Sequence, residues 1–339
     1  MIGIVSSPDD LHAQVVRDEL DARGAEHVLI DTGSLPAVTS VTVTQHDDTW
    51  SAMWDRGTFG GRVDVTDLHA MWWRRPQPFD IPVEVSEPID RDFARGECAA
   101  FLTGLWSCLD ARWVNDPDAD EAASRKMRQL KVAASLGLDI PRTCMTSDPA
   151  VAREFIDVFG GVARDDGSLV GESAVIFKPF SATEATWRET RPVRTGDLAL
   201  LDGVRCAPVI FQEYVGGADV RVTVVGEQVF AAATRCDEGG YPYDFRVDPD
   251  RTWSVHQLPE PVAAALLGLH RALGIWYGAV DLRLTPQGRY VFLEVNPAGQ
   301  WLFTELPTGL EISAALADLL VFFDRGGTRG EMANRCQVG

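Results

Sequence analysis

The sequence predicts an α/β (α+β) protein of three parts: an N-terminal domain around a parallel sheet, a small central α+β domain, and a C-terminal domain with an antiparallel sheet. Three observations predict this fold. The chain has 339 residues, enough for two or three domains. Residues 1–30 read strand, helix, strand, which is typical of a parallel sheet. From residue 219 onward most segments are strand-like, and this favours antiparallel pairing.

The N-terminal domain is expected over residues 1–115. It opens with two short apolar strands, 2–5 and 27–30, and the helix between them, 9–23, ends at Gly24. An Asn-Asp-Pro turn at 115–117 marks its boundary. The other elements expected here are hairpin strands 40–46 and 49–54, a strand 68–73, a helix 91–109 and a strand 112–114.

The central domain is expected over residues 116–215. A single helix over 119–136 is predicted to end at Gly137, and a second helix covers 148–159. Apolar runs bounded by turn residues predict strands at 140–145, 174–178, 185–190 and 209–214.

The C-terminal domain is expected over residues 216–325, followed by a tail at 326–339. The Pro-Gln-Gly turn within 285–289 predicts a hairpin from the two strands beside it. The elements expected here are strands 220–225, 228–234, 252–257, 277–284 and 290–295, and helices 261–273 and 310–323.

Composition excludes several classes of function. A formal charge of −19 argues against a nucleic-acid partner, because phosphates would be repelled. No apolar run approaches the ~18 residues of a membrane span, and the N-terminus has no basic segment of a signal peptide. The six cysteines are scattered without C-x-x-C spacing, so neither a metal site nor disulfides are expected. These features predict a reduced, cytoplasmic enzyme without a membrane partner.

Two strands near residue 290 carry the most specific signal. Glu294 and Asn296 are two positions apart on one predicted strand, so both side chains point to one face. Asp281 lies on the partner strand and is expected to face the same way. Two carboxylates and an amide oxygen form the hard-oxygen site that Mg²⁺ prefers. The alternative, a solvated hairpin face, is less consistent with the apolar neighbours, which would bury unpaired carboxylates.

Two further segments suggest a nucleotide. Lys178 ends an apolar strand before Pro179, in a position to reach a phosphate as a point charge. The strand at 209–215 breaks at Gly216-Gly217, and such a hinge offers backbone donors and acceptors to an adenine edge. Glu213 in this hinge could equally be a solvated loop charge, and Lys178 alone would be a weak signal.

Together these residues resemble the ATP-grasp superfamily over residues 115–323. The resemblance follows the order Lys126, Lys178-Pro, Gln212-Glu213-Tyr214-Val215, Asp219-x-Arg221, Arg235, Asp281 and Glu294-x-Asn296-Pro297. It implies a ligase that uses ATP and Mg²⁺, with two ions expected, and residues 1–114 then look like a pre-ATP-grasp domain. The loop 181–187 lacks the glycines that often cover the phosphates in that superfamily.

The resemblance also implies a role for each matching residue. Lys126 and Lys178 would contact the ATP phosphates, Glu213, Tyr214 and Val215 the adenine, and Asp219 the ribose, while Asp281, Glu294 and Asn296 would bind magnesium. Arg221, Arg235 and Arg246 would serve catalysis, the first two by steadying phosphate or an acyl phosphate, and Arg235 and Arg246 could also bind an acidic core peptide. No Ser–His or Cys–His pairing indicates a covalent enzyme intermediate, and the six histidines are interpreted as structural or surface groups.

Two segments narrow the family. Residues 296–316 are similar to the C-terminal signature of the ribosomal-peptide maturases that make microviridins and related graspetides, and residues 72–76, Trp-Trp-Arg-Arg-Pro, are similar to theirs too. This resemblance implies that Asp or Glu side chains of a precursor peptide are joined to hydroxyls or amines as ω-ester or ω-amide macrocycles. A leader segment of the precursor would dock on the enzyme. Arg74 and Arg75 would bind the acidic core peptide, the alternative being a solvated strand end.

Other functions stay open at this point. Residues 125–141 and the Asp-Phe-Arg triplet at 244–246 are shared with glutamate-adding ligases, which would attach an amino acid to a peptide or metabolite. A non-catalytic ATP-binding module is the alternative of a different class. The oligomeric state is also open, a homodimer being common among such ligases.

Overall fold

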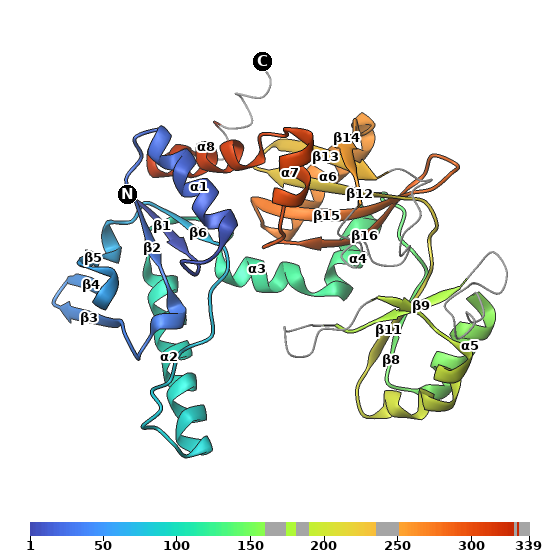
Figure 1. The fold of residues 1–339 in the computed structure, drawn as a ribbon, viewed down its shortest axis with the longest axis horizontal. Helices are drawn as coiled ribbons and strands as arrows, with labels where there is room; N and C mark the ends of the chain where they lie inside the picture. Colours follow the sequence, from blue (N-terminus) through green and yellow to red (C-terminus); the bar gives the residue numbers. More distant parts are fainter. Residues whose placement is uncertain (160–173, 181–189, 235–250, 329–330, 332–339) are drawn as a thin grey trace.

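The computed structural model describes residues 1–159, 174–180, 190–234, 251–328 and 331. Their strands form four sheets, of which three correspond to the three predicted parts of the chain and the fourth is a small hairpin sheet. Figure 1 shows the N-terminal part on one side, the long C-terminal sheet opposite it, and the small central sheet below the latter.

The N-terminal sheet is parallel throughout, as predicted, with strand order β2-β1-β6-β7. Its helix α1 (Leu11–Ala22) begins after Asp10, whose carboxylate caps the first turn, and ends before Gly24, which has a φ of +63°. The strands are β1 (Ile2–Val5), β2 (His27–Ile30), β6 (Ala70–Trp73) and β7 (Arg112–Val114), and α2 (Pro88–Cys108) precedes the last of them.

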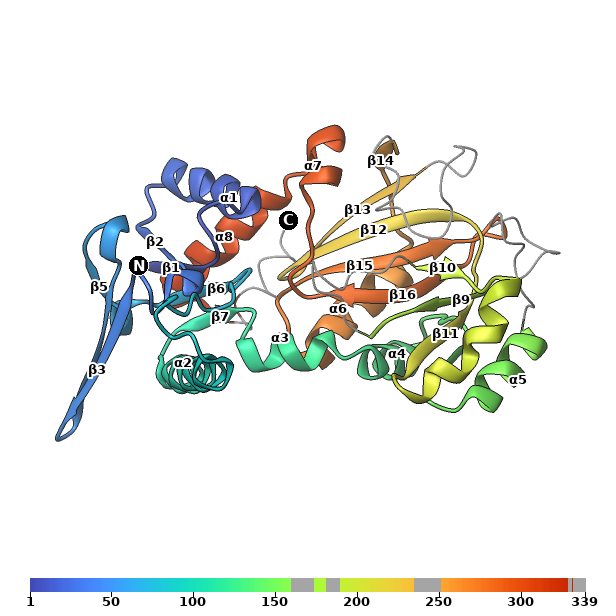
Figure 2. The ribbon, with the colours of Figure 1, turned by 60° about the horizontal axis from the view of Figure 1, so that its bottom comes forward.

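The predicted hairpin is confirmed and projects from this domain (Figure 2). It consists of β3 (Ser40–His46) and β4 (Thr49–Asp55), and a short third strand, β5 (Arg62–Asp64), extends it. Short 3₁₀ turns lie at Thr32–Ser34, Gly57–Phe59 and Val65–Asp67.

The prediction of a single helix over 119–136 is wrong. The structure has two helices, α3 (Pro117–Ser124) and α4 (Lys126–Ser135), separated by Arg125 in an extended conformation (φ −72°, ψ 107°). In a continuous helix the Ala123 carbonyl would accept from residue 127. Here it accepts from the buried Gln129 side chain at 2.7 Å, so a side-chain hydrogen bond compensates for the break.

The central sheet is small and antiparallel, with order β10-β9-β11-β8. Helix α5 (Pro149–Phe159) and a 3₁₀ segment, η5 (Thr195–Arg205), share one apolar core with it. Most of the strand predicted at 185–190 lies outside the described residues. The strands are β8 (Thr143–Thr146), β9 (Val175–Lys178), β10 (Arg191–Pro192) and β11 (Val209–Glu213).

The C-terminal sheet is antiparallel, as predicted, with order β14-β13-β12-β15-β16. One face is apolar and packs against α4 and α6 (Glu260–Leu273), which places the charged residues of the strands on the opposite face. The strands are β12 (Ala218–Val225), β13 (Gln228–Thr234), β14 (Trp253–Val255), β15 (Tyr277–Leu284) and β16 (Tyr290–Asn296).

The last helices connect the two ends of the chain. After α7 (Leu302–Thr308), helix α8 (Ile312–Asp324) lies beside α1 (Figure 1) and enters the core of the N-terminal sheet. The same core includes Trp72 from β6 and Trp301 from the segment before α7. Within the described ranges no single helix is long and apolar enough to cross a bilayer; α7 and α8 meet that test only as a pair, bent by 117°.

Candidate functional site

The charged face of the C-terminal sheet is organised by strand register. Asp281 on β15 lies between Arg221 on β12 and Glu294 on β16, directly opposite each of them. The Arg221 Nη1 atom donates to Asp281 Oδ1 at 2.6 Å, and the guanidinium is only 6% exposed. Asn296 follows Glu294 by two positions, so its side chain emerges on the same face. The predicted period-two arrangement of these carboxylates is therefore present.

Two lysines from other elements converge on this face. Lys126, the first residue of α4, has its Nζ atom 3.0 Å from Glu294 Oε2, and Lys178, at the end of β9, has its Nζ atom 3.6 Å from the same oxygen. Burial lowers the pKa of Lys178, while the Glu294 carboxylate opposes this shift. Two ammonium groups over one carboxylate leave a local excess of positive charge in a strongly acidic protein. Such an excess suits phosphate groups.

A side chain that the sequence analysis missed holds Lys126 in place. Gln129, three residues further along α4, is buried, donates to the Val295 carbonyl at 2.7 Å and accepts from the Val295 amide at 3.2 Å. Val295 lies between Glu294 and Asn296, so this contact ties the start of α4 to the strand that carries both. A glutamine within a helical pattern gave no signal of this contact.

The donor set fits a magnesium ion. Asp281, Glu294 and Asn296 offer only oxygen atoms from adjacent strands, and Mg²⁺ is commonly held by one or two carboxylates plus water and phosphate. The described ranges hold no group of three or more His, Cys, Asp and Glu residues that could bind a metal, and the set proposed here consists of two carboxylates and one amide. The Asn296 Oδ1 atom also accepts from the Ala298 amide at 3.0 Å, which fixes the orientation of its side chain.

The predicted adenine hinge connects β11 with β12. The Tyr214 amide donates to the Ala174 carbonyl at 2.8 Å, and the Glu213 amide donates to the Arg142 carbonyl at 2.9 Å. Gly217 has a φ of +139°, and a Cβ atom there would lie 2.0 Å from the Leu284 carbonyl oxygen, so only glycine fits. Contact of Glu213, Tyr214 and Val215 with adenine stays a prediction.

Asp219 does not present an open carboxylate. It is 5% exposed, and its oxygens meet Arg283 Nη1 at 2.9 Å and the guanidinium of Arg251. Burial raises the pKa of Asp219, and the two arginines oppose this. Both carboxylate oxygens have guanidinium partners, and the ribose contact of Asp219 stays a prediction. Arg283 alternates with Asp281 along β15, a pattern from which its place on this face could have been predicted.

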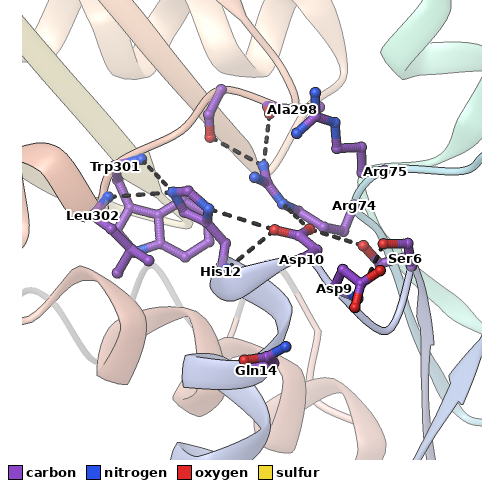
Figure 3. Close-up of polar contacts among 12 residues, drawn as sticks. Ser6, Asp9, Asp10, His12, Gln14, Arg74, Arg75, Ala298, Trp301 and Leu302 are labelled. Atoms are coloured by element: carbon purple, nitrogen blue, oxygen red, sulfur yellow. Dashed lines mark hydrogen bonds and ion pairs between the residues drawn. The ribbon is translucent and has the colours of Figure 1, made fainter.

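Burial places Arg74 out of reach of a substrate peptide, contrary to the prediction. Its side chain is 1% exposed, donates to Asp10 Oδ2 at 2.9 Å and to the Ala298 carbonyl at 2.7 Å, and lies over the Trp301 ring (Figure 3). Arg75 next to it is exposed, so its proposed contact with peptide stays a prediction. Arg235, Arg246 and the loop 181–187 lie outside the described residues.

Two family models match the chain. The description "MvdD pre-ATP grasp domain" matches residues 2–121, and "RimK-like ATP-grasp domain" matches residues 195–320. Together they cover more than half of the chain. The curated relatives that match include a probable alpha-L-glutamate ligase of Pseudoalteromonas translucida, 27% identical over 61% of this chain. The chain covers 66% of that relative, slightly less than two thirds of its length.

Solved structures match nearly the whole chain. The macrocyclase MdnC of Microcystis aeruginosa, bound with precursor peptide MdnA, has a TM-score of 0.81 at 28% identity, covering 94% of this chain and 98% of MdnC. A ligase associated with ribosomal peptides from Chryseobacterium gregarium, in complex with ADP and a leader and core peptide, has a TM-score of 0.82 at 25% identity, covering 97% and 98%.

A third structure was solved with the metal. The ATP-grasp ligase PsnB, complexed with a phosphomimetic precursor variant, Mg and ADP, has a TM-score of 0.74 at 25% identity, covering 95% of this chain and 98% of PsnB. The parallel N-terminal sheet and the antiparallel sheets elsewhere agree with these matches. The chain belongs to the ATP-grasp ligases, and within them it is similar to ligases that act with ribosomal precursor peptides.

Proposed function

We propose that this ATP-grasp ligase activates Asp or Glu side chains of a ribosomal precursor peptide as acyl phosphates and closes ω-ester or ω-amide macrocycles. The observation that carries the nucleotide half of the proposal is the convergence of Lys126 and Lys178 on Glu294. The peptide half is supported by the match to MdnC and the Chryseobacterium ligase, which extends through the N-terminal domain as well as the ATP-grasp region.

Each group on the charged face has a role in this proposal. Lys126 and Lys178 would neutralise the phosphate oxygens of ATP, and release Glu294 from their ion pairs as they do so. Glu294, Asp281 and Asn296 would then hold magnesium, for which we propose two ions. Bound magnesium supplies charge neutralisation between the phosphate oxygens.

Arg221 is placed to serve the transferred phosphoryl group. Its guanidinium is fixed by Asp281 at 2.6 Å and by the Gln300 carbonyl at 2.9 Å, so it would meet developing negative charge without reorganising. A peptide carboxylate oxygen attacks the γ-phosphorus and ADP leaves. A hydroxyl or amine of the same peptide then attacks the acyl carbon, phosphate leaves and one proton is lost. For each ring closed, one ADP and one phosphate are formed from ATP, and the peptide loses the elements of one water.

The partners follow from the same comparison. We propose that a leader segment of the precursor docks on this chain, as leader and core peptides are bound together in the Chryseobacterium structure. A homodimer is also proposed, and sedimentation of the purified protein tests it.

The test is co-incubation of the protein, ATP and Mg²⁺ with a Thr/Lys/Asp/Glu-rich candidate precursor, followed by intact-mass analysis. We expect the peptide to lose one water per ADP formed. Unchanged peptide mass despite ADP formation would show that the peptide is not cyclised. A control precursor with its Asp and Glu residues changed to Asn and Gln should give neither product.

A glutamate-adding activity is the second candidate, because the curated relatives are glutamate ligases. It predicts a gain of one glutamyl residue by a peptide or metabolite when free glutamate is supplied. The same mass measurement, with and without glutamate, separates the two functions by the sign of the mass change.

A further inference from the structure

The loop that follows Asn296 is held almost entirely by distant side chains. Residues 297–301 form no helix or strand, yet most of their carbonyls accept a hydrogen bond from another element. We refer to residues 296–302 as the Asn296 loop. Asn115 Nδ2 donates to the Pro297 carbonyl at 3.1 Å, and Arg221 Nη2 donates to the Gln300 carbonyl at 2.9 Å. Arg74 Nη1 donates to the carbonyls of Ala298 at 2.7 Å and Gly299 at 3.2 Å, and Tyr277 Oη donates to the Gly299 carbonyl at 2.6 Å.

The amides at the far end of the loop have one acceptor from the N-terminal domain. The Trp301 and Leu302 amides both donate to His12 Nε2, at 3.2 and 3.3 Å (Figure 3). A nitrogen that accepts these bonds carries no proton, so His12 is neutral here with its proton on Nδ1. The Nδ1 atom faces Asp10 Oδ1 at 3.5 Å.

Asp10 joins His12 and Arg74 into one unit. Its Oδ2 atom accepts from Arg74 Nε at 2.9 Å and from Ser6 Oγ at 2.8 Å, while its Oδ1 atom accepts from the His12 amide at 3.1 Å. Burial alone would raise the pKa of Asp10, but the hydrogen bonds from His12 and the charge of Arg74 hold it well below its usual range. Asp10 is therefore a fixed anion that orients both side chains toward the Asn296 loop.

Packing leaves the loop no alternative path. Trp301 is fully buried, with the His12 ring 4.6 Å from its own and the Arg74 guanidinium 5.2 Å above it. A Cβ atom on Gly299 would lie 2.4 Å from Ala279 Cβ and 3.0 Å from Arg221 Nη2. The loop thus lies against β15 on one side and against the Asp10–His12–Arg74 unit on the other.

We propose that Asp10, His12 and Arg74 are positioning residues through which the N-terminal domain sets the metal affinity of the site on the C-terminal sheet. They fix the Asn296 loop, and the loop fixes two groups at the site: the side chain of Asn296, through the Ala298 amide, and the guanidinium of Arg221, through the Gln300 carbonyl. The proposal rests on the magnesium–nucleotide part of the proposed function and not on its peptide part.

A merely structural role for this unit makes a different prediction. An interface that only holds two domains together would change thermal stability and leave magnesium-dependent binding unaltered in the folded protein. A positioning role weakens binding that depends on Asn296 and leaves metal-free nucleotide binding by Lys126 and Lys178 in place. The ratio of ADP affinities with and without Mg²⁺ therefore separates the two roles.

The experiment is calorimetric titration of ADP into full-length protein, with Mg²⁺ or with EDTA. We expect Arg74→Met to weaken binding about 10- to 100-fold with Mg²⁺, the range for groups that orient metal ligands, and to leave binding in EDTA within about 2-fold. Arg74→Lys, which keeps one donor group, should recover part of the loss.

Arg91→Met is the matched control. Arg91 also clamps loop carbonyls within the N-terminal domain, at Ile81, Pro82 and Val85 with distances of 2.9 to 3.0 Å, but has no contact with the Asn296 loop. We expect it to leave both ADP affinities unchanged.

Three results decide the proposal. If Arg74→Met keeps the wild-type ratio of affinities, the unit is structural and the proposal is overturned. If Arg74→Met does not fold, His12→Phe, which keeps a ring beside Trp301 but has no acceptor for the loop amides, decides by the same ratio. If wild-type protein shows no magnesium dependence at all, the proposed metal site fails first, and the inference with it.

Discussion

Two arginines bind the Asn296 loop from opposite sides, and they differ in the carboxylate with which each forms an ion pair. Arg74 comes from the N-terminal domain, and its carboxylate partner, Asp10, is buried beside α1. Arg221 comes from the C-terminal sheet, and its partner, Asp281, belongs to the proposed magnesium site. Both guanidinium groups bind loop carbonyls, and we propose a positioning role for Arg74 and contact with phosphate for Arg221.

The two arginines differ in how deeply their carboxylate partners are buried. Asp10 has a side-chain exposure of 4% and Asp281 of 17%, and Glu294 beside it 24%. A carboxylate that keeps some access to solvent can accept a metal ion, whereas a fully enclosed one cannot do so without leaving its buried cation unpaired.

The largest effect is expected from Glu294→Gln. It removes the charge shared by Lys126 and Lys178 and one proposed metal oxygen, so ADP formation with precursor peptide should fall by on the order of 100-fold or more. The rate of ADP release measures it. Asp139→Asn is the control, because Asp139 pairs with exposed Arg289 away from the charged face. Near-normal turnover by Glu294→Gln would contradict the assignment.

A large loss of stability is expected when Arg74, the arginine with the buried partner, is replaced. Arg74→Met leaves Asp10 as an unpaired buried anion and should lower the free energy of unfolding by about 3–5 kcal/mol. Urea unfolding measures this, and adding Asp10→Asn to the same protein should recover part of the loss. Arg221→Met should cost clearly less, because Asp281 retains solvent and lysine neighbours. Equal losses for the two arginines would remove the distinction between them.

The smallest effect concerns pH. Burial lowers the pKa of His12, its hydrogen bond to Asp10 opposes this, and Arg74 and Arg75 add positive charge beside it. The unfolded chain therefore binds a proton at His12 that the folded chain does not, and stability should fall as pH drops below about 6.5. Melting temperatures from pH 8 to 5 measure this, and the part due to His12 should vanish in His12→Gln. An unchanged pH dependence in that variant would contradict the neutral His12 inferred from its two backbone donors.

Much of the charged face followed from sequence, because strand periodicity is local. Alternation alone placed Glu294 and Asn296 on one face, and the register of β15 with β16 then confirmed Asp281 opposite Glu294. Resemblance to a known family supplied Lys126 and Lys178, which no local pattern connects to that face.

The features that could not be predicted from sequence depend on long-range contacts. No proline or glycine marks the break at Arg125, which is stabilised by Gln129 bonding to a strand 166 residues away. Arg74 was expected to bind the core peptide or, alternatively, to be a solvated strand end, because its partner Asp10 lies 64 positions earlier in the chain. Helix α8 was expected in the C-terminal domain, yet its apolar face completes the core around β1 and β6.

The most direct test of the central claim is a crystal structure with ADP and Mn²⁺ in place of Mg²⁺, with the metal located by its anomalous signal. We expect manganese at about 2 Å from oxygens of Glu294 and of Asp281 or Asn296, with Lys126 and Lys178 turned from Glu294 to the phosphates. Manganese bound elsewhere, with both lysines still paired to Glu294, would contradict it.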